Sequence, residues 1–331
     1  MSQNQLKDDL KALEMVRLVL VKLATTLLQE LGVFDTIKTP KSLEYISTKC
    51  NIKNKKMLEN MLDILVGYGI LAYTQKGYLL IEMKNLNIKP AEDFLKKNYK
   101  ESLEWIYFVN QFSSTTLTKN KPTELTGFEE EKAIYYWNKI MEQSPHSLRV
   151  LAITELYRNL NPGSLVLDYG CGGGVGLQQL IELSNKPIQL VGTDPSTKFF
   201  LEAQSRIGKL NFYDSTKNIN KENIKFEDFK NLNKYTGRFD AIFISIIFNH
   251  IYERDHIKVF KKLRKLLKPG GKLAIVQLLD FSKYNRNPIW VMHNIPSHKG
   301  YPLRDNFVSG LKNTFPKVDI YLDGMVTIST K

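Results

Sequence analysis

The chain has 331 residues, of which 43% are apolar and 24% are charged. This length predicts about two domains, and the apolar share is enough for a sizeable core. Two cysteines are too few for a disulfide framework or a thiolate metal site, which fits a reducing compartment such as the cytoplasm. Charged residues interrupt the apolar N-terminal segment, so neither a signal peptide nor a membrane span is expected there.

The formal net charge of +13 raises the question of a nucleic-acid partner. The lysines are scattered through the chain, and the local runs KKNYK at 96–100 and KKLRKLLK at 261–268 lie on expected helices. Compositional bias explains such a distribution as well as a binding surface does. Nucleic acid therefore stays an alternative partner and is not the favoured one.

The first 90 residues have the pattern of a small helical domain with a two-stranded wing. Apolar residues at helical spacing predict a long helix over 5–31, and Gly32 is placed to end it. Two shorter helices follow, within FDTIKTPKSLEYISTKC and NKKMLENMLDILVGYGIL. The stretch GILAYTQKGYLLIE then predicts two strands around a Gln-Lys-Gly turn. This order is typical of a winged-helix domain.

Residues 91–155 are expected to form a helical connector, broken near TKNKPTELTGF. From 156 to 331 strands alternate with helices, which predicts an α/β domain with a parallel sheet covered on both faces. The last two strands lie on either side of Asp323-Gly324, a strong hairpin signal. The expected strands are 164–168, 188–193, 224–226, 239–245, 272–277, 317–322 and 325–330, and the expected helices are 174–183, 196–206 and 254–267.

Five glycines gather in LVLDYGCGGGVG, residues 165–176, between a strand and a helix. In an open parallel sheet, ligands bind beyond the carboxyl ends of the strands. No lysine follows in P-loop spacing, and G-x-G-x-x-G fails from either starting glycine. The loop instead has the form D-x-G-x-G-x-G, and Asp168 suits a ligand with a cationic amino group. The glycines of this pattern are Gly170, Gly172 and Gly174.

Two further acidic positions follow the next strands. Asp194, in the sequence LVGTDPS with Pro195, is placed to accept hydrogen bonds from both ribose hydroxyls of a nucleoside. After IKF, Asp228 can accept from an adenine amino group while Phe229 flanks the ring. The sequence therefore predicts a nucleoside ligand that also carries an amino group.

These positions together resemble the class I S-adenosylmethionine-dependent methyltransferases. The glycine loop, Asp194, the pair Asp228-Phe229 and the segment LRKLLKPGGKLAIVQ (263–277) match the family's motifs in order over about 110 residues. The resemblance implies a Rossmann-like doubly wound sheet with a C-terminal antiparallel hairpin. It also implies S-adenosyl-L-methionine as the cofactor.

The N-terminal half resembles the caffeate and hydroxyindole O-methyltransferase type, in which a winged-helix domain forms an intertwined homodimer. The resemblance implies a homodimer and a small-molecule methyl acceptor, most simply a hydroxyl of an aromatic or polyketide-like compound. Three alternatives stay open: a C- or N-methyltransferase on the same scaffold, a nucleic-acid-binding protein, and a non-catalytic protein that keeps the cofactor site.

The catalytic base of this family is a histidine just past the fourth strand. In the corresponding stretch, FNHIYERDHIKVFKKL, Asn249 occupies that position and His250 the next one. Either His250 serves as the base after a shift of one residue, or the base is absent and Asn249 only orients the acceptor. Ser245 aligns with a residue that often reaches the cofactor carboxylate.

Candidate substrate-lining residues lie in two segments. One helix carries Trp137 and Met141, and NPIWVMHNIPSHKGYP (287–302) carries Trp290, Met292 and His293. Aromatic and Met side chains at such spacing are also typical of a plain core, and His293 could be a second base. His293 and His298 have no supporting acidic cluster, so no metal site is expected.

Overall fold

The computed structural model describes residues 3–83, 85–143, 146–158, 160–210, 219, 221–281 and 289–331. The chain forms two compact units, and each has its own core. The sheet unit comprises Phe128–Leu279 and Pro302–Lys331, with the first residues of the chain up to Leu6; the helical unit comprises Lys7–Gly127 and Asp280–Tyr301.

Most of the predicted long helix belongs to the helical unit, from Lys7 on, and the helix ends before Gly32 adopts a left-handed φ of 71°. Ser42 and Asn54 then cap two helices by accepting hydrogen bonds from Tyr45 N and Met57 N. The predicted hairpin turns at Gly77, where a Cβ would lie 2.0 Å from Lys41 O. The elements are α1 (Gln3–Glu30), α2 (Val33–Thr36), α3 (Leu43–Lys49), α4 (Lys55–Gly67), β1 (Leu71–Thr74), β2 (Gly77–Leu80), α5 (Lys89–Asn98), α6 (Lys100–Asn110), α7 (Ser113–Lys119), η1 (Glu124–Thr126) and η6 (Trp290–Asn294).

The sheet unit follows the predicted alternation of strands and helices. Its helices and turns are α8 (Glu131–Glu142), α9 (His146–Tyr157), α10 (Val175–Glu182), α11 (Thr197–Gly208), η2 (Lys221–Asn223), η3 (Phe229–Tyr235), η4 (Phe248–His250), η5 (Glu253–Asp255), α12 (His256–Leu266), α13 (Arg304–Thr314) and η7 (Leu322–Gly324). Its strands are β3 (Leu165–Tyr169), β4 (Gln189–Thr193), β5 (Ile224–Phe226), β6 (Phe239–Ser245), β7 (Leu267–Val276), β8 (Lys317–Tyr321) and β9 (Val326–Thr330). Helix α13 has no counterpart in the prediction.

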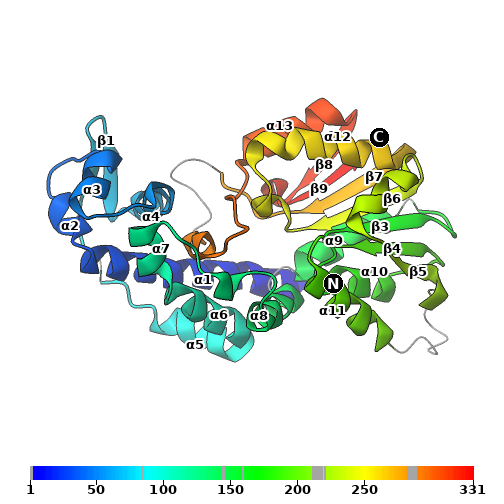
Figure 1. Cartoon of the computed structure of the whole chain (residues 1–331), viewed down its shortest axis with the longest axis horizontal. Helices are drawn as coiled ribbons and strands as arrows, with labels where there is room; N and C mark the ends of the chain where they lie inside the picture. Colours follow the sequence, from blue (N-terminus) through cyan, green and yellow to red (C-terminus); the bar gives the residue numbers. More distant parts are fainter. Residues whose placement is uncertain are drawn as a thin grey trace. The chain divides into compact units, whose positions relative to one another are not determined.

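In the described residues, the seven strands of this unit have the order β5-β4-β3-β6-β7-β9-β8. The pairs up to β6–β7 are parallel, and β9 pairs antiparallel with both β7 and β8. Two apolar clusters cover the sheet, one with α9, α10 and α11 and the other with α12 and α13 on the opposite face (Figure 1). The doubly wound sheet and its C-terminal hairpin are therefore confirmed. Strand order reverses between β3 and β6, which is where such folds bind ligands.

The compact units do not end at the predicted boundaries 90 and 155. The predicted connector is divided between them after residue 127. Helices α6 and α7 pack against η6 in the helical unit, whereas α8 and α9 pack against α10 and the sheet. Helical periodicity identifies the apolar face of a helix but not the core it joins. Among the described helices, none is both long and apolar enough to span a membrane.

Candidate functional site

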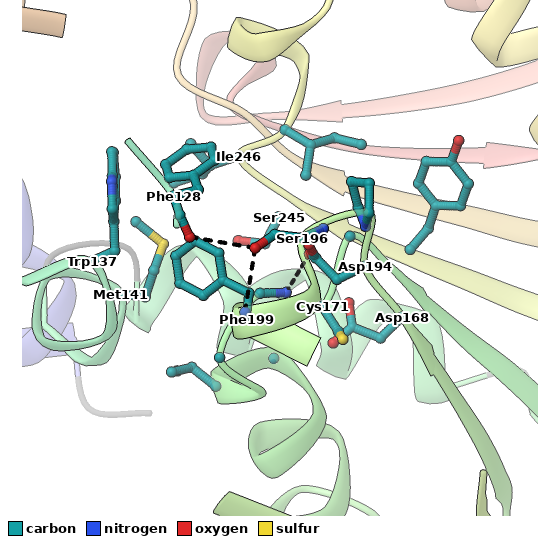
Figure 2. A pocket seen from close by; sticks show the side chains of 18 of the residues that line it. Phe128, Trp137, Met141, Asp168, Cys171, Asp194, Ser196, Phe199, Ser245 and Ile246 are labelled. Atoms are coloured by element: carbon teal, nitrogen blue, oxygen red, sulfur yellow. Dashed lines mark hydrogen bonds between the residues drawn. The ribbon is translucent and has the colours of Figure 1, made fainter. Parts of the chain in front are cut away.

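A cavity of about 300 Å³ lies in the sheet unit where β3 and β6 end (Figure 2). Three glycines of the loop after β3, Gly170, Gly172 and Gly174, have a positive φ. Gly170 and Gly172 line the cavity, whereas Gly174 does not belong to its lining. A Cβ at Gly170 would lie 2.8 Å from Ile247 Cγ2, and one at Gly174 would lie 3.0 Å from Ala203 Cα. A Cβ at Gly172 would meet nothing within 4 Å. Gly170 and Gly174 therefore allow close packing, and Gly172 borders open space.

The carboxylate of Asp194, at the end of β4, holds this loop in place. One oxygen accepts from Gly172 N at 2.8 Å, and the other accepts from Ser196 N at 2.9 Å. Burial raises the pKa of Asp194, although both hydrogen bonds act in the opposite direction. The structure thus brings together two predicted site residues, Gly172 after β3 and Asp194 after β4. The neighbouring Pro195 also lines the cavity.

Asp168 is the most perturbed acidic residue in the cavity wall. Its side chain is 1% exposed, and its Oδ2 has no hydrogen-bond partner. Burial and then the nearby charge of Asp194 raise the pKa of Asp168 to about 8, against the opposing effect of Arg149. Ser245 Oγ is a second buried polar atom in this wall without a partner. Buried polar groups are usually satisfied, and a polar ligand in this cavity would supply partners for both atoms.

The sequence interpretation missed Arg149. This residue lies on α9, is 1% exposed and lines the same cavity. Its Nε donates to Gln179 Oε1 at 2.5 Å, and a second guanidinium nitrogen donates to Met141 O. A buried guanidinium places a fixed positive charge in the cavity wall. The available signal was one arginine within the otherwise apolar run LRVLAI.

Aromatic side chains form another part of the wall. Phe128 contacts Trp137 and Phe199, with ring centroids 5.8 and 5.3 Å apart. Ser196 Oγ lies between them, at hydrogen-bond distance from Phe128 O and Phe199 N (Figure 2). The predicted substrate residues Trp137 and Met141 both line the cavity.

The predicted adenine pair is split by the structure. Phe229 lines the cavity and packs on Tyr169 with ring centroids 5.0 Å apart. Asp228 is exposed and does not belong to the cavity lining. Its Oδ1 accepts from Lys230 N at 2.8 Å, as the cap of the 3₁₀ turn η3. The ring, and not the carboxylate, is therefore the part of this pair that faces the cavity.

The chain after β6 turns sharply and brings one histidine to the cavity. Ile246 has a φ of 53°, which is a strained conformation for a β-branched residue. His250 lines the cavity and its ring lies 4.7 Å from that of Phe128. Asn249 is fully buried outside the cavity lining, and its Nδ2 lies 2.9 Å from His250 Nε2. Of the two predicted catalytic candidates, only His250 faces the cavity.

The second predicted substrate segment lies in the helical unit and contributes nothing to this cavity. Trp290 is 1% exposed and its Nε1 donates to Leu20 O at 3.1 Å, and Met292 is equally buried. His293 Nε2 lies 2.7 Å from Asn60 Nδ2. Trp290 and Met292 thus belong to the core of the helical unit. Residues 287 and 288 of the predicted segment lie outside the described residues.

Comparison with known proteins finds a similarity in part of the sheet unit. Residues 167–273, which include the glycine loop, Asp194 and His250, match a family model described as "Methyltransferase domain". Residues 167–273 are therefore similar in sequence to methyltransferase domains. The match agrees with the predicted cofactor, S-adenosyl-L-methionine. The unsatisfied atoms of Asp168 and Ser245 and the open space at Gly172 fit a ligand of that polarity.

Individual relatives match less than the whole chain. An uncharacterized protein of Rickettsia prowazekii, RP028, is 32% identical over 41% of this chain and 50% of its own length. A ubiquinone biosynthesis O-methyltransferase of Aliivibrio fischeri is 29% identical over 50% of this chain and 64% of its own. The chain thus spans between half and two thirds of these relatives.

A solved structure shares the fold over almost the full chain. The CurJ carbon methyltransferase superposes with a TM-score of 0.66 and 14% identity, covering 94% of this chain and 90% of its own. At this identity the likeness establishes a common fold and no more.

Proposed function

We propose that this protein transfers a methyl group from S-adenosyl-L-methionine to a small molecule. The observation that carries the proposal is the pair of buried, unsatisfied polar atoms, Asp168 Oδ2 and Ser245 Oγ, in one cavity with the open space at Gly172. When bound, the cofactor supplies an electrophilic methyl group on a sulfonium. The residues of the chain bind it and align it with the acceptor.

The polar residues divide between the two ends of such a cofactor. Asp168 binds the cationic amino group, while Arg149 and the Ser245 hydroxyl bind the carboxylate. Asp194 accepts from the ribose hydroxyls while its hydrogen bond to Gly172 N keeps the loop closed. Phe229 and Tyr169 flank the adenine ring, and the predicted role of Asp228 there stays a prediction.

The aromatic wall formed by Phe128, Trp137 and Phe199, with Met141 beside it, selects a flat, apolar acceptor. We place the transfer at a hydroxyl oxygen of an aromatic or polyketide-like compound. The name of the Aliivibrio fischeri relative, a ubiquinone biosynthesis O-methyltransferase, supports this choice.

Methylation at carbon is the second candidate. One observation favours it. Asn249 occupies the position at which the O-methyltransferases that the sequence resembles have a histidine as catalytic base, and Asn249 is buried and does not line the cavity. The shared fold with a protein named as a carbon methyltransferase is compatible with this alternative. Radioactive methyl transfer to matched phenol and 1,3-dicarbonyl acceptors, with product analysis, separates the two.

The helical unit is assigned to assembly. We propose that its helices and β1–β2 hairpin form a winged-helix domain that holds a homodimer in the cytoplasm, as in the O-methyltransferases that the sequence resembles. Sedimentation equilibrium tests the dimer. A salt-sensitive affinity for DNA or RNA would instead favour the nucleic-acid alternative.

Calorimetric titration with S-adenosylmethionine, S-adenosylhomocysteine and, as a control, NAD tests the cofactor directly. Micromolar binding of the first two and none of NAD is expected. If none of the three binds, the chain is not a methyltransferase in this form.

A further inference from the structure

One guanidinium group joins three elements around the glycine loop. Arg206, on α11, donates from Nε to Gly173 O at 2.8 Å and from Nη1 to Gln178 Oε1, on α10, at 3.1 Å. Its Nη2 donates to Glu142 Oε1, at the end of α8, at 2.7 Å. Of these four residues, only Gly173 lines the cavity. The guanidinium group therefore acts on the cavity from behind its wall.

Helix α8 packs directly on the glycine loop at this point. A Cβ on Gly173 would lie 1.9 Å from Asn138 Oδ1, so a side chain at this position would push the helix away. Asn138 lines the cavity together with Trp137 and Met141 from the same helix. The contact between the loop and α8 therefore sets the distance between the loop and the part of the cavity wall that α8 carries.

Helix α8 has little buried apolar surface to hold it in this place. Of its apolar side chains, Ala133 and Ile134 are buried, and Met141 packs partly buried against the sheet core. Arg149 secures the last turn of α8 by donating to Met141 O. Arg206 secures the same turn and, with the same planar group, the glycine loop. The guanidinium of Arg206 thereby fixes the helix and the loop relative to each other.

The ion pair of Arg206 and Glu142 lies partly out of solvent. The two side chains are 17% and 31% exposed. Burial acts to raise the pKa of Glu142, but hydrogen bonds from Lys139 and Arg206 lower it below its ordinary value. The carboxylate is therefore charged at neutral pH. A charge-assisted hydrogen bond in such a place is stronger than one at an open surface.

We propose that Arg206 and Glu142 are positioning residues that hold α8, with Trp137 and Met141, against the glycine loop before any ligand binds. The consequence for catalysis rests on the proposed function, because the loop is assigned there to the cofactor and the α8 wall to the methyl acceptor. Neither positioning residue lines the cavity. Without their ion pair a ligand must order α8 itself, and the cost of that ordering lowers its affinity.

Amide hydrogen exchange of the full chain, measured by mass spectrometry, tests the positioning role without any ligand. Arg206→Met removes the donors and keeps the length of the side chain, and Glu142→Ala removes the acceptor. In both variants we expect the amides of 131–142 and 170–174 to exchange about tenfold faster or more. The amides of β3, β4 and β6 should keep their rates, which distinguishes a local opening from a general loss of stability.

Three further variants show whether the contact itself is responsible. Arg158→Met is the matched control, because Arg158 pairs with Glu155 at 2.7 Å in the same unit and lies outside the cavity lining. Exchange in 131–142 should be unchanged by it. Glu142→Gln retains an oxygen that accepts from Arg206 and should restore most of the protection that Glu142→Ala loses. Arg206→Met/Glu142→Ala should exchange little faster in 131–142 than Arg206→Met alone, since the contact is already absent.

S-adenosylhomocysteine tests the consequence for ligand binding. In Arg206→Met it should slow exchange in 131–142 more than in the unmodified chain, where the helix is already held. Its Kd by calorimetry should rise about tenfold in this variant.

The outcomes separate the positioning role from the proposed function. Unchanged exchange in ligand-free Arg206→Met and Glu142→Ala overturns the positioning role, as does faster exchange spread evenly over the strands of the sheet. Fully additive effects in the double variant overturn it as well, because the two side chains would then act apart. If S-adenosylhomocysteine binds neither the variant nor the unmodified chain while the ligand-free rates are as expected, the cofactor assignment fails and the positioning role stands.

Discussion

The two sides of the cavity are built in different ways. On the side of β3 and β4, the wall consists of backbone N–H groups and the carboxylates of Asp168 and Asp194, and glycines allow the backbone to pack closely. On the side of β6 and β7, the buried side chains of Gln277 and Asn249 contact Phe248 N, each other and the ring of His250, and Gln277 and Asn249 are 28 residues apart in the sequence. The first side depends on local spacing, and the second depends on which strands are neighbours.

This difference predicts how each side responds to substitution. A side chain introduced into the glycine loop blocks the space for the ligand, so the substitution lowers the affinity for the ligand. Removing one of the buried amides leaves its partners without a hydrogen bond, and the loss is in the stability of the turn after β6. The substitutions below test the first side in order of decreasing effect.

The largest effect is expected from Gly172→Arg. The new side chain would project into the open space of the cavity and block the ligand. S-adenosylhomocysteine binding by calorimetry should become undetectable. Gly163→Arg is the matched control, because Gly163 has a φ of 81°, is exposed, has open space beside it and lies outside the cavity. Equal loss in both variants would attribute the effect to backbone strain and not to the site.

Asp194→Ala should weaken S-adenosylhomocysteine binding by about 2 kcal/mol or more, which is about 30-fold in Kd. The substitution removes an acceptor for the ribose and also releases Gly172 N and Ser196 N. Asp240→Ala serves as the control, since Asp240 accepts from Leu165 N at the far end of the sheet. An unchanged Kd in Asp194→Ala would rule out the ribose assignment.

The pH dependence of stability tests the raised pKa of Asp168. The folded chain keeps a proton on Asp168 up to about pH 8, whereas an unfolded aspartate loses it near pH 4. The free energy of unfolding contributed by Asp168 is therefore full below about pH 4 and falls as pH rises toward 8, by up to about 1.4 kcal/mol per pH unit. Urea unfolding between about pH 5 and pH 7 should show this slope, and Asp168→Asn should lack it. Parallel curves for the two proteins would contradict the shift.

Binding of a ligand with a cationic amino group should reverse this protonation. The ammonium favours the ionised carboxyl, so S-adenosylhomocysteine should displace a proton from Asp168 near neutral pH. Calorimetry in two buffers of different ionisation enthalpy measures that release. Asp168→Asn should abolish it, and a ligand without the amino group should not cause it.

The fold and the first side of the cavity could be predicted from the sequence. The spacing of Asp168, Gly172 and Asp194 fixes their places at the ends of adjacent strands, because parallel strands end at one edge of the sheet. The alternation of strands and helices likewise predicts the doubly wound sheet. These are consequences of periodicity and topology, which a single sequence contains.

The rest depended on contacts that spacing does not encode. Arg149 lies before β3 on a helix, and only packing turns it into the cavity. Which of Asn249 and His250 lines the cavity depends on the turn after β6, where Ile246 has a φ of 53° that no propensity predicts. Trp290 and Met292 are residue types that are common in substrate pockets, but both side chains are buried in the core of the helical unit.

The smallest effects concern the adenine end, where the structure divides Phe229 from Asp228. Phe229→Ala should weaken S-adenosylhomocysteine binding by about 1 kcal/mol, because it removes an aromatic surface from the cavity wall. Asp228→Ala should change it by less than about 0.5 kcal/mol, since that carboxylate is exposed and already accepts from Lys230 N. Calorimetry of the two variants under one condition compares their losses of binding free energy. An effect at Asp228 as large as that at Phe229 would mean that the carboxylate leaves its cap to bind the adenine amino group, and that this end of the site rearranges when the ligand enters.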